Sequence, residues 1–250
     1  MSKNILFVLE GSWTEPRLLK RIVESMGLGM EYKVFCYNTN IHAMLDGMFV
    51  DDDIDEDLDF QEYLRSCRTG NDEGHILDES FSDIFLMFDM DPHDHRYDPK
   101  RLTKAAEYFD DSTDNGKLYI NYPMVESFKH VSNLYDLSYL ETRVDSNGIR
   151  SYKQLVGRDG LASLSDIAKI DDSTMMRLIE LNLMKANMLV TGGRGVPSPD
   201  CYRDNLTQEI ILSKQLAHYS NEGQLHVLNT SLFIAIDYNA ERFFERMLKM

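Results

Sequence analysis

Cysteine is scarce in this chain, with three in 250 residues, at positions 36, 67 and 201. They are isolated and odd in number, so a CxxC zinc or redox site and a disulfide framework are excluded, and reduced thiols are expected. No apolar run approaches the length of a membrane span, and the first one ends at Glu10, too soon for a signal peptide. We therefore expect a cytoplasmic protein that does not enter a membrane.

Positive charge is also in short supply. The chain has 26 Lys and Arg against 42 Asp and Glu, giving a net charge of -16. Proteins that coat nucleic acids neutralise phosphates with Lys and Arg, so this balance excludes a general polyanion-coating protein. The negative net charge does not exclude an enzyme that acts on nucleic acids, because a local basic patch and bound divalent cations can make the electrostatic potential positive at one site.

Apolar runs alternate with amphipathic helical stretches in the first half of the chain. This alternation predicts an α/β fold, in which a mainly parallel sheet is flanked by helices and any site lies at the carboxyl ends of the strands. The predicted strands are 4–9, 31–38, one within 81–91 that is strongly apolar at 84–88, and 116–123. The predicted helices are 15–26, 40–49, 60–67, 99–109 and a helical start at 124–131.

The pattern changes after about residue 135. We expect residues 1–135 to form the α/β core and residues 136–250 to form a mostly helical extension packed on it. No internal repeat and no long linker separates the two parts. The extension is predicted to contain helices 173–189, 206–219 and 240–249, a Gly- and Pro-rich loop at 191–205 and one late strand within 223–239.

Acidic residues follow three of the predicted strands. Glu10 ends the first, Asp89 and Asp91 end the third, and Glu126 follows the fourth. Converging carboxylates repel each other unless a cation binds among them, and Mg²⁺ prefers such oxygen ligands. Side chains along a strand alternate between the two faces of the sheet, so Asp89 and Asp91, two residues apart, would point to the same face. Glu10, Asp89 and Asp91 are therefore predicted to approach one metal ion.

A purely structural explanation exists for the first of these acids. Glu10 can simply end a strand, Gly11 can supply a turn, and Thr14 can cap a helix whose first turn favours Glu15. Taken alone, this explanation is the better one for Glu10. The matching acids at the other strand ends favour the metal site.

Three short motifs carry a family resemblance. "VLEG" at the end of the first strand, "WTEP" after it and "FDMD" at the end of a later strand resemble the Toprim domain, most closely the RloB-like and overcoming-lysogenization-defect nucleases of bacteria. The resemblance covers residues 3–135. It implies that Glu10, Asp89 and Asp91 are catalytic and bind Mg²⁺ or Mn²⁺, with water as the nucleophile. Glu15 and Glu126, the latter in "NYPMVES", resemble second-site acids.

The resemblance implies a nuclease that acts on DNA or RNA, and an effector of a bacterial anti-phage defence system. No Walker A loop is present, since "TGGRG" lacks the GK[ST] ending, so an ATPase, if required, would be a separate partner. Two alternatives remain open. One is a binding or regulatory module that cuts nothing, and the other is a different metal-dependent phosphoryl-transfer enzyme.

Basic residues on the helix after "FDMD" could meet substrate phosphates, namely Lys100, Arg101 and Lys104. The alternative is an exposed, solvated helix face, which is the commoner role of such residues. Other basic candidates are Arg17, Lys20, Arg21 and Arg194.

Some further features have two interpretations each. Trp13 could stack on a base or pack on the core. His93 and His95 could carry protons beside the site, whereas a zinc site lacks matching ligands. The acidic run 51–59 is expected to be a solvated loop, because it lacks the glycine and the spacing of a calcium loop.

Overall fold

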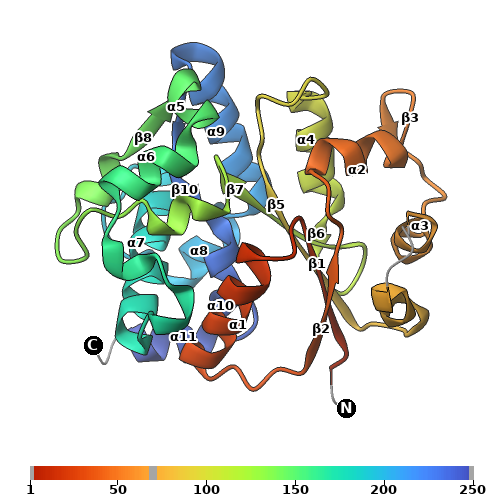
Figure 1. Ribbon diagram of the computed structural model, residues 1–250, viewed down its shortest axis with the longest axis horizontal. Coiled ribbons are helices and arrows are strands. Elements are labelled where there is room, and N and C mark those ends of the chain that lie inside the picture. Colours follow the sequence, from red (N-terminus) through yellow and green to blue (C-terminus); the bar gives the residue numbers. More distant parts are fainter. Residues whose placement is uncertain (1–2, 68–71, 248–250) are drawn as a thin grey trace.

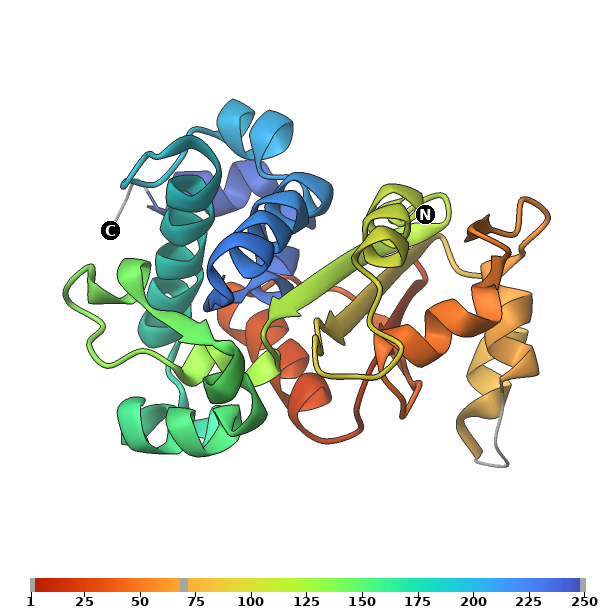
Figure 2. The ribbon, with the colours of Figure 1, turned by 90° about the horizontal axis from the view of Figure 1, so that it is seen from above.

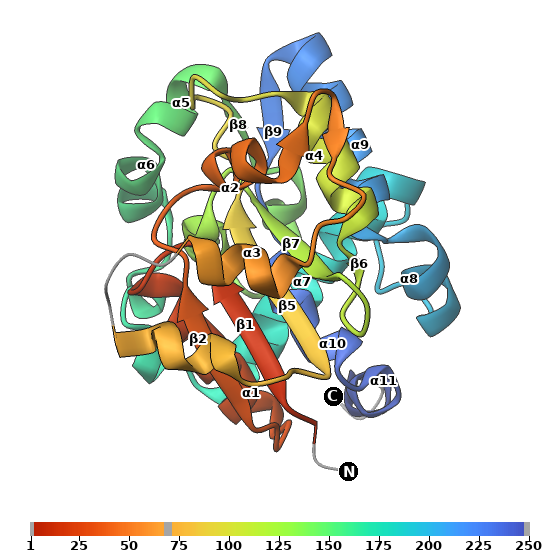
Figure 3. The same ribbon diagram turned by 90° about the vertical axis from the view of Figure 1, so that its right-hand side faces the viewer.

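The computed structural model describes residues 3–67 and 72–247. Within these residues the main sheet has six strands in the order β10-β7-β5-β1-β2, and β6 also pairs with β7. Strands β2, β1, β5 and β7 are parallel and lie in this order across the sheet (Figure 3). The strands are β1 (Ile5–Leu9), β2 (Tyr32–Cys36), β5 (Asp83–Asp89), β6 (Asp110–Asp111), β7 (Gly116–Tyr122) and β10 (Leu228–Asn229).

The predicted α/β fold with a mainly parallel sheet is confirmed. Buried apolar residues fill every position of β1, as expected for a central parallel strand covered on both faces. The chain leaves β1 through α1 (Thr14–Met26) toward β2, and leaves β5 through α4 (Pro99–Tyr108) toward β7. These two connections run in opposite directions along the sheet. The carboxyl ends of β1 and β5 therefore form a topological switch point, where open α/β sheets bind ligands.

The segment between β2 and β5 forms a small excursion at the edge of the sheet, drawn in orange in Figure 1. It contains α2 (Ile41–Met48), α3 (Phe60–Ser66) and a short hairpin of β3 (Phe49–Val50) with β4 (Asp53–Ile54). The acidic run 51–59 begins in this hairpin and is mostly exposed.

The C-terminal region is mostly helical, as predicted, and lies on the opposite side of the molecule from this excursion (Figure 1). Helix α7 packs on α1, and α9 packs on α4 and beside β7 (Figure 2). Besides the β3–β4 hairpin, another two-stranded sheet joins β8 to β9. The remaining elements are β8 (Arg143–Asp145), α5 (Ser146–Arg150), α6 (Tyr152–Asp159), α7 (Asp172–Thr191), α8 (Pro199–Asn205), α9 (Gln208–Glu222), β9 (Gln224–His226), α10 (Ile234–Asp237) and α11 (Ala240–Met247), with short 3₁₀ helices that include η2 (Val125–Lys129), η5 (Ile167–Lys169) and η6 (Thr230–Phe233).

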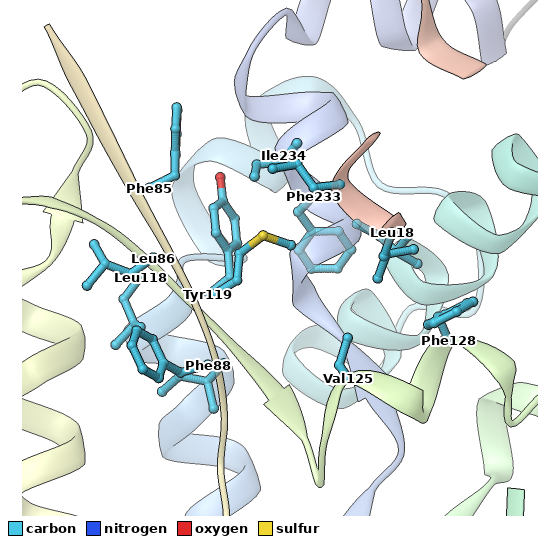
Figure 4. Close-up of a cluster of buried hydrophobic side chains, with 14 of the residues drawn as sticks. Leu18, Phe85, Leu86, Phe88, Leu118, Tyr119, Val125, Phe128, Phe233 and Ile234 are labelled. Atoms are coloured by element: carbon cyan, nitrogen blue, oxygen red, sulfur yellow. The ribbon is translucent and has the colours of Figure 1, made fainter. Parts of the chain in front are cut away.

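One apolar core joins the sheet to the C-terminal region. Figure 4 shows Phe233 and Ile234 beside Tyr119 of β7 and Leu18 of α1. All four side chains are almost completely buried. Strand β10 also pairs antiparallel with β7, so the C-terminal region contributes to the main sheet as well as covering it.

Four local predictions are wrong. Trp13, not Thr14, is the N-cap of α1, and its side chain makes no capping hydrogen bond. The stretch 124–131 forms only the 3₁₀ helix η2, and the predicted loop 191–205 contains α8. Within 223–239 only β9 and β10 are strands, whereas 230–237 is helical. Residues 230–236 are all buried, and residues 232–236 are all apolar. Such a run lacks the periodic pattern that would distinguish a helix from a strand.

No helix in the described ranges has the length and apolar character needed to cross a membrane.

Candidate functional site

Two parallel strands at the switch point each lead into an acid. Glu10 directly follows β1, and its backbone N–H donates to the carbonyl of Met87 in β5 at 3.1 Å. Asp89 is the last residue of β5 and lies in register with Asn121 of β7. Because the carboxyl ends of parallel strands meet at one edge, the tertiary fold brings Glu10 and Asp89 together.

A hydrogen bond joins these two acids. Oε2 of Glu10 accepts from the backbone N–H of Asp89 at 2.9 Å. Oδ1 of Asp89 accepts in turn from the backbone N–H of Val125 at 2.7 Å and from Nδ2 of Asn121 at 3.4 Å. The Asp89 side chain is buried. Strands β1, β5 and β7 thereby fix the orientation of both carboxyl groups.

Glu15 and Glu126 line the same open cleft, which has a volume of about 360 Å³. Glu15 lies in the first turn of α1 and Glu126 lies in η2, and both are buried. Oε1 of Glu126 is 3.3 Å from Nζ of Lys153, whereas its Oε2 is buried and has no hydrogen-bond partner among the described residues. In the described part of the chain, Lys153 is the one cation that lines this cleft of four acids.

Burial, with a smaller effect from neighbouring acids, raises the pKa values of Glu10, Glu15 and Asp89. Burial, followed by the charges of Asp91 and Glu15, raises the pKa of Glu10 to about 8, against the opposing effect of its hydrogen bond from Asp89. Burial has the largest effect on the pKa of Glu15 and raises it, and the negative charge of Glu126 adds to this. Burial also raises the pKa of Asp89, and here the negative charge of Glu10 adds to the effect. The cleft thus carries more negative potential than Lys153 balances, and a bound cation would relieve it.

Asp91 does not follow the strand alternation. Strand β5 ends at Asp89, and Asp91 has a φ of 46°, in the left-handed region. Asp91 is not among the residues that line the cleft, although its charge acts on Glu10. Strand alternation therefore does not extend to Asp91, because β5 ends at Asp89 and the chain turns at Asp91. A metal site shared by Asp89 and Asp91 stays a prediction.

The donor set bears on the metal prediction. Across residues 3–67 and 72–247, no three His, Cys, Asp or Glu side chains are arranged so that they could hold one ion together. Mg²⁺, however, is commonly bound through one or two carboxylates and completes its shell with water and phosphate oxygens. Glu10 and Asp89 offer such a pair, and Glu126 offers an unpartnered buried oxygen. The residues of the cleft therefore fit a hard divalent cation in chemistry.

The basic residues predicted on α4 lie elsewhere. Arg101 pairs with Asp46 at 2.7 Å, and Lys104 pairs with Asp53 at 2.7 Å. Lys100 is exposed on the same helix, and none of the three lines the cleft. The partners of Arg101 and Lys104 are acids of the excursion between β2 and β5.

The predicted histidines also lie outside the cleft lining. His93 is exposed, and its Nε2 is 2.8 Å from the carbonyl oxygen of Ser146. His95 is exposed, with Nδ1 3.5 Å from Oδ1 of Asp94. Trp13 lines the cleft and is 67% exposed, so it does not pack on the core.

Two residues of the site escaped the sequence analysis. Asn121 lies inside the predicted fourth strand, and the register of parallel β5 and β7 would have placed it beside Asp89. Lys153 belongs to α6, far along the chain from the strands, and no local pattern points to it.

The chain was also compared with known proteins. No protein-family model, curated protein or solved structure matches it.

Proposed function

We propose that this protein is a metal-dependent nuclease, which hydrolyses phosphodiester bonds of DNA or RNA in the cleft between β1, β5 and η2. The observation that carries the proposal is the pairing of Glu10 with Asp89 at the switch point, in a cleft that Glu15 and Glu126 also line. The resemblance of "VLEG" and "FDMD" to the Toprim motifs supports the same reaction.

Each residue of the cleft has a proposed role. Glu10 and Asp89 would hold Mg²⁺ or Mn²⁺, with Asp91 at the rim, and Glu15 and Glu126 would serve a second site. When bound, the ion supplies a more acidic water and neutralises charge on the phosphodiester. Buried Val125 and Asn121 keep the Asp89 carboxylate in place through their hydrogen bonds.

Lys153 has a further proposed role in binding the substrate. Its side chain is 72% exposed, while its ammonium group stays within 3.3 Å of Glu126. Burial lowers the pKa of Lys153, but Glu126 and Asp89 outweigh this effect and raise it. A permanently charged ammonium group at the mouth of the cleft is suited to contact a substrate phosphate.

The resemblance alone leads us to propose a biological setting. The protein would act as an effector of bacterial anti-phage defence in the cytoplasm, under the control of a separate ATPase partner.

The test is a cleavage assay with purified protein in Mn²⁺ or Mg²⁺. The substrates are single-stranded and duplex DNA, RNA and small phosphate esters, and the variants are Glu10→Gln, Asp89→Asn and the exposed control Asp51→Asn. We expect polymer cleavage by the wild type and the control, and a loss of at least about 100-fold in the two site variants, as for removal of a group that stabilises the transition state.

Other outcomes would contradict the nuclease proposal. Turnover of small esters alone would indicate a phosphatase or nucleotidyltransferase. Nucleic-acid binding without turnover under any metal condition would indicate a binding or regulatory module. Cleavage that Asp89→Asn retains in full would place the reaction elsewhere in the molecule.

A further inference from the structure

A second concave surface adjoins the acidic cleft. It is a groove of about 590 Å³ between one side of α1 and the segment 165–168, with Lys129 at the end of η2. Trp13 and Thr14 line both the groove and the cleft. A ligand long enough to pass Trp13 would therefore contact both the groove and the acidic cleft.

The groove has a net positive charge, opposite in sign to the net charge of the whole protein. Its cations outnumber its acids, in a chain with a net charge of -16. The cations are Arg17, Lys20, Arg21 and Lys129, and the acids are Glu24 and Asp166.

Two of these cations are available to a ligand. Arg21 is engaged by Asp172 at 2.5 Å, and Lys20 lies 3.8 Å from Glu24. Arg17 and Lys129, by contrast, form no salt bridge with any residue of the described ranges, and each lies over an aromatic ring instead. Two cations without carboxylate partners in one groove suit a ligand with regularly spaced negative charges.

Trp13 marks the junction of the groove and the cleft. It is the single tryptophan of the chain and is 67% exposed. The guanidinium carbon of Arg17 lies 3.5 Å from the centroid of its ring. Arg17 thus covers one face of the indole and orients it, and the large exposure leaves the ring accessible for stacking.

We propose that this groove binds single-stranded nucleic acid, with phosphates on Arg17 and Lys129 and an unpaired base stacked on Trp13. A basic groove with an aromatic platform is how single strands are held without sequence preference. A duplex hides its base faces in its own stack, so Trp13 favours a single strand or an unpaired loop. The delivery of the next phosphodiester to Glu10 and Asp89 rests on the proposed function, whereas binding in the groove does not.

The binding test uses the full chain in EDTA, so that neither metal nor cleavage contributes. The probes are single-stranded DNA and RNA of about 12 nucleotides, within the usual site size, and a duplex of the same sequence. Because Trp13 is the only tryptophan, its intrinsic fluorescence reports stacking directly. We expect both single strands to quench it and the duplex to leave it almost unchanged.

Variants then separate the groove from the rest of the surface, with anisotropy of a labelled strand as the readout. Arg17→Ala and Lys129→Ala should each weaken binding at least about 5-fold and lower the slope of log K against log salt by about 0.7, the value for one phosphate contact of a single strand. Trp13→Ala should weaken binding, and Trp13→Phe should restore most of it. Lys214→Ala on α9, an exposed lysine that does not line the groove, is the matched control and should bind like the wild type.

The groove and the nuclease can fail separately. If the single strands do not quench Trp13, or if Arg17→Ala and Lys129→Ala both bind like the wild type, the groove proposal is overturned even where cleavage is observed. If the groove variants lose binding as expected but no metal yields cleavage, the groove proposal stands and the nuclease proposal falls. Equal affinity for the duplex would overturn the preference for single strands.

Discussion

The carboxylate of Glu10 accepts a hydrogen bond of 2.9 Å from the backbone N–H of Asp89, so the acid after one strand is fastened to the last residue of its neighbour. The bond stabilises the charged form of Glu10, but burial and nearby acids act against that charge more strongly. Two acids are therefore held together in a place where burial disfavours the charged form of both, and the charge of Glu10 adds to this effect at Asp89. Such an arrangement costs stability unless a cation is bound.

We expect millimolar Mg²⁺ or Mn²⁺ to raise the melting temperature of the wild type, because a ligand selective for the native state stabilises it by ~2.7 kcal/mol at 100 times its Kd. Asp89→Asn should lose most of this response. Its metal-free form should be as stable as the wild type or more so, because the amide oxygen can still accept from Val125 while the repulsion is removed. Thermal melting with and without metal measures both effects. The exposed control Asp51→Asn should respond to metal like the wild type. No metal response in the wild type, or a full response in Asp89→Asn, would contradict the site.

Replacement of Asp51, Asp52 and Asp53 by Asn should change the free energy of unfolding by less than ~1 kcal/mol, because exposed charges contribute little. The ion pair of Asp53 with Lys104 is the main interaction that this triple variant removes, and the Asp53 side chain is 73% exposed. Asp59, in the same acidic run, caps α3, and its replacement by Ala should cost ~1 kcal/mol. Urea denaturation of the two variants compares them. Loss of cleavage in the triple variant, to the level of Asp89→Asn, would show that the run has a catalytic role.

Asp237 should be one of the costliest positions outside the cleft. Its carboxylate accepts from the hydroxyls of Tyr119 at 2.6 Å and Tyr202 at 2.8 Å, and Nζ of Lys117 lies 2.9 Å away. Asp237→Ala would leave two buried hydroxyls without this acceptor, and we expect a loss of ~3 kcal/mol or more in unfolding free energy. The exposed Asp200→Ala, which breaks a surface pair on α8, is the control and should cost under ~1 kcal/mol. Similar losses in both variants would contradict this account of the C-terminal packing.

Acid should destabilise the protein through His226. Burial, together with the charges of Lys185, Arg143 and His218, lowers the pKa of His226 from 6.5 to about 3. Between these values the unfolded chain binds a proton that the folded chain does not, so the contribution of His226 to stability falls as pH drops below 6.5, by up to ~1.4 kcal/mol per pH unit. Glu10, whose pKa is raised to about 8, contributes with the opposite sign in the same range. His226→Leu should remove the destabilising contribution and so change the slope, and the exposed His75→Leu should keep the slope of the wild type. Chemical denaturation between about pH 7 and pH 4 measures the slopes. Equal slopes in the wild type and His226→Leu would rule out this residue as the cause.

The sequence was informative where the structure is local and regular. The apolar runs of β1, β5 and β7 are long enough to predict buried strands. An acid lies at or near the end of each: Glu10 directly after β1, Asp89 as the last residue of β5, and Glu126 four residues after β7. Parallel pairing then places Glu10 and Asp89 at one edge by geometry alone. Asp91 departed from this logic because the strand ends at Asp89, and the end of an element is set by turns that hydrophobic pattern does not encode.

The sequence by itself determined the α/β class, the central strands and the acids at their ends, because burial on both faces of a parallel sheet demands continuous apolar runs and leaves polar residues to the strand ends. The tertiary structure alone decided the rest. Lys153 reaches Glu126 from a helix of the C-terminal region, and Lys129 shares a groove with α1 because η2 packs there. These contacts join segments that are distant along the chain, and no local period records which distant segment will cover a given surface.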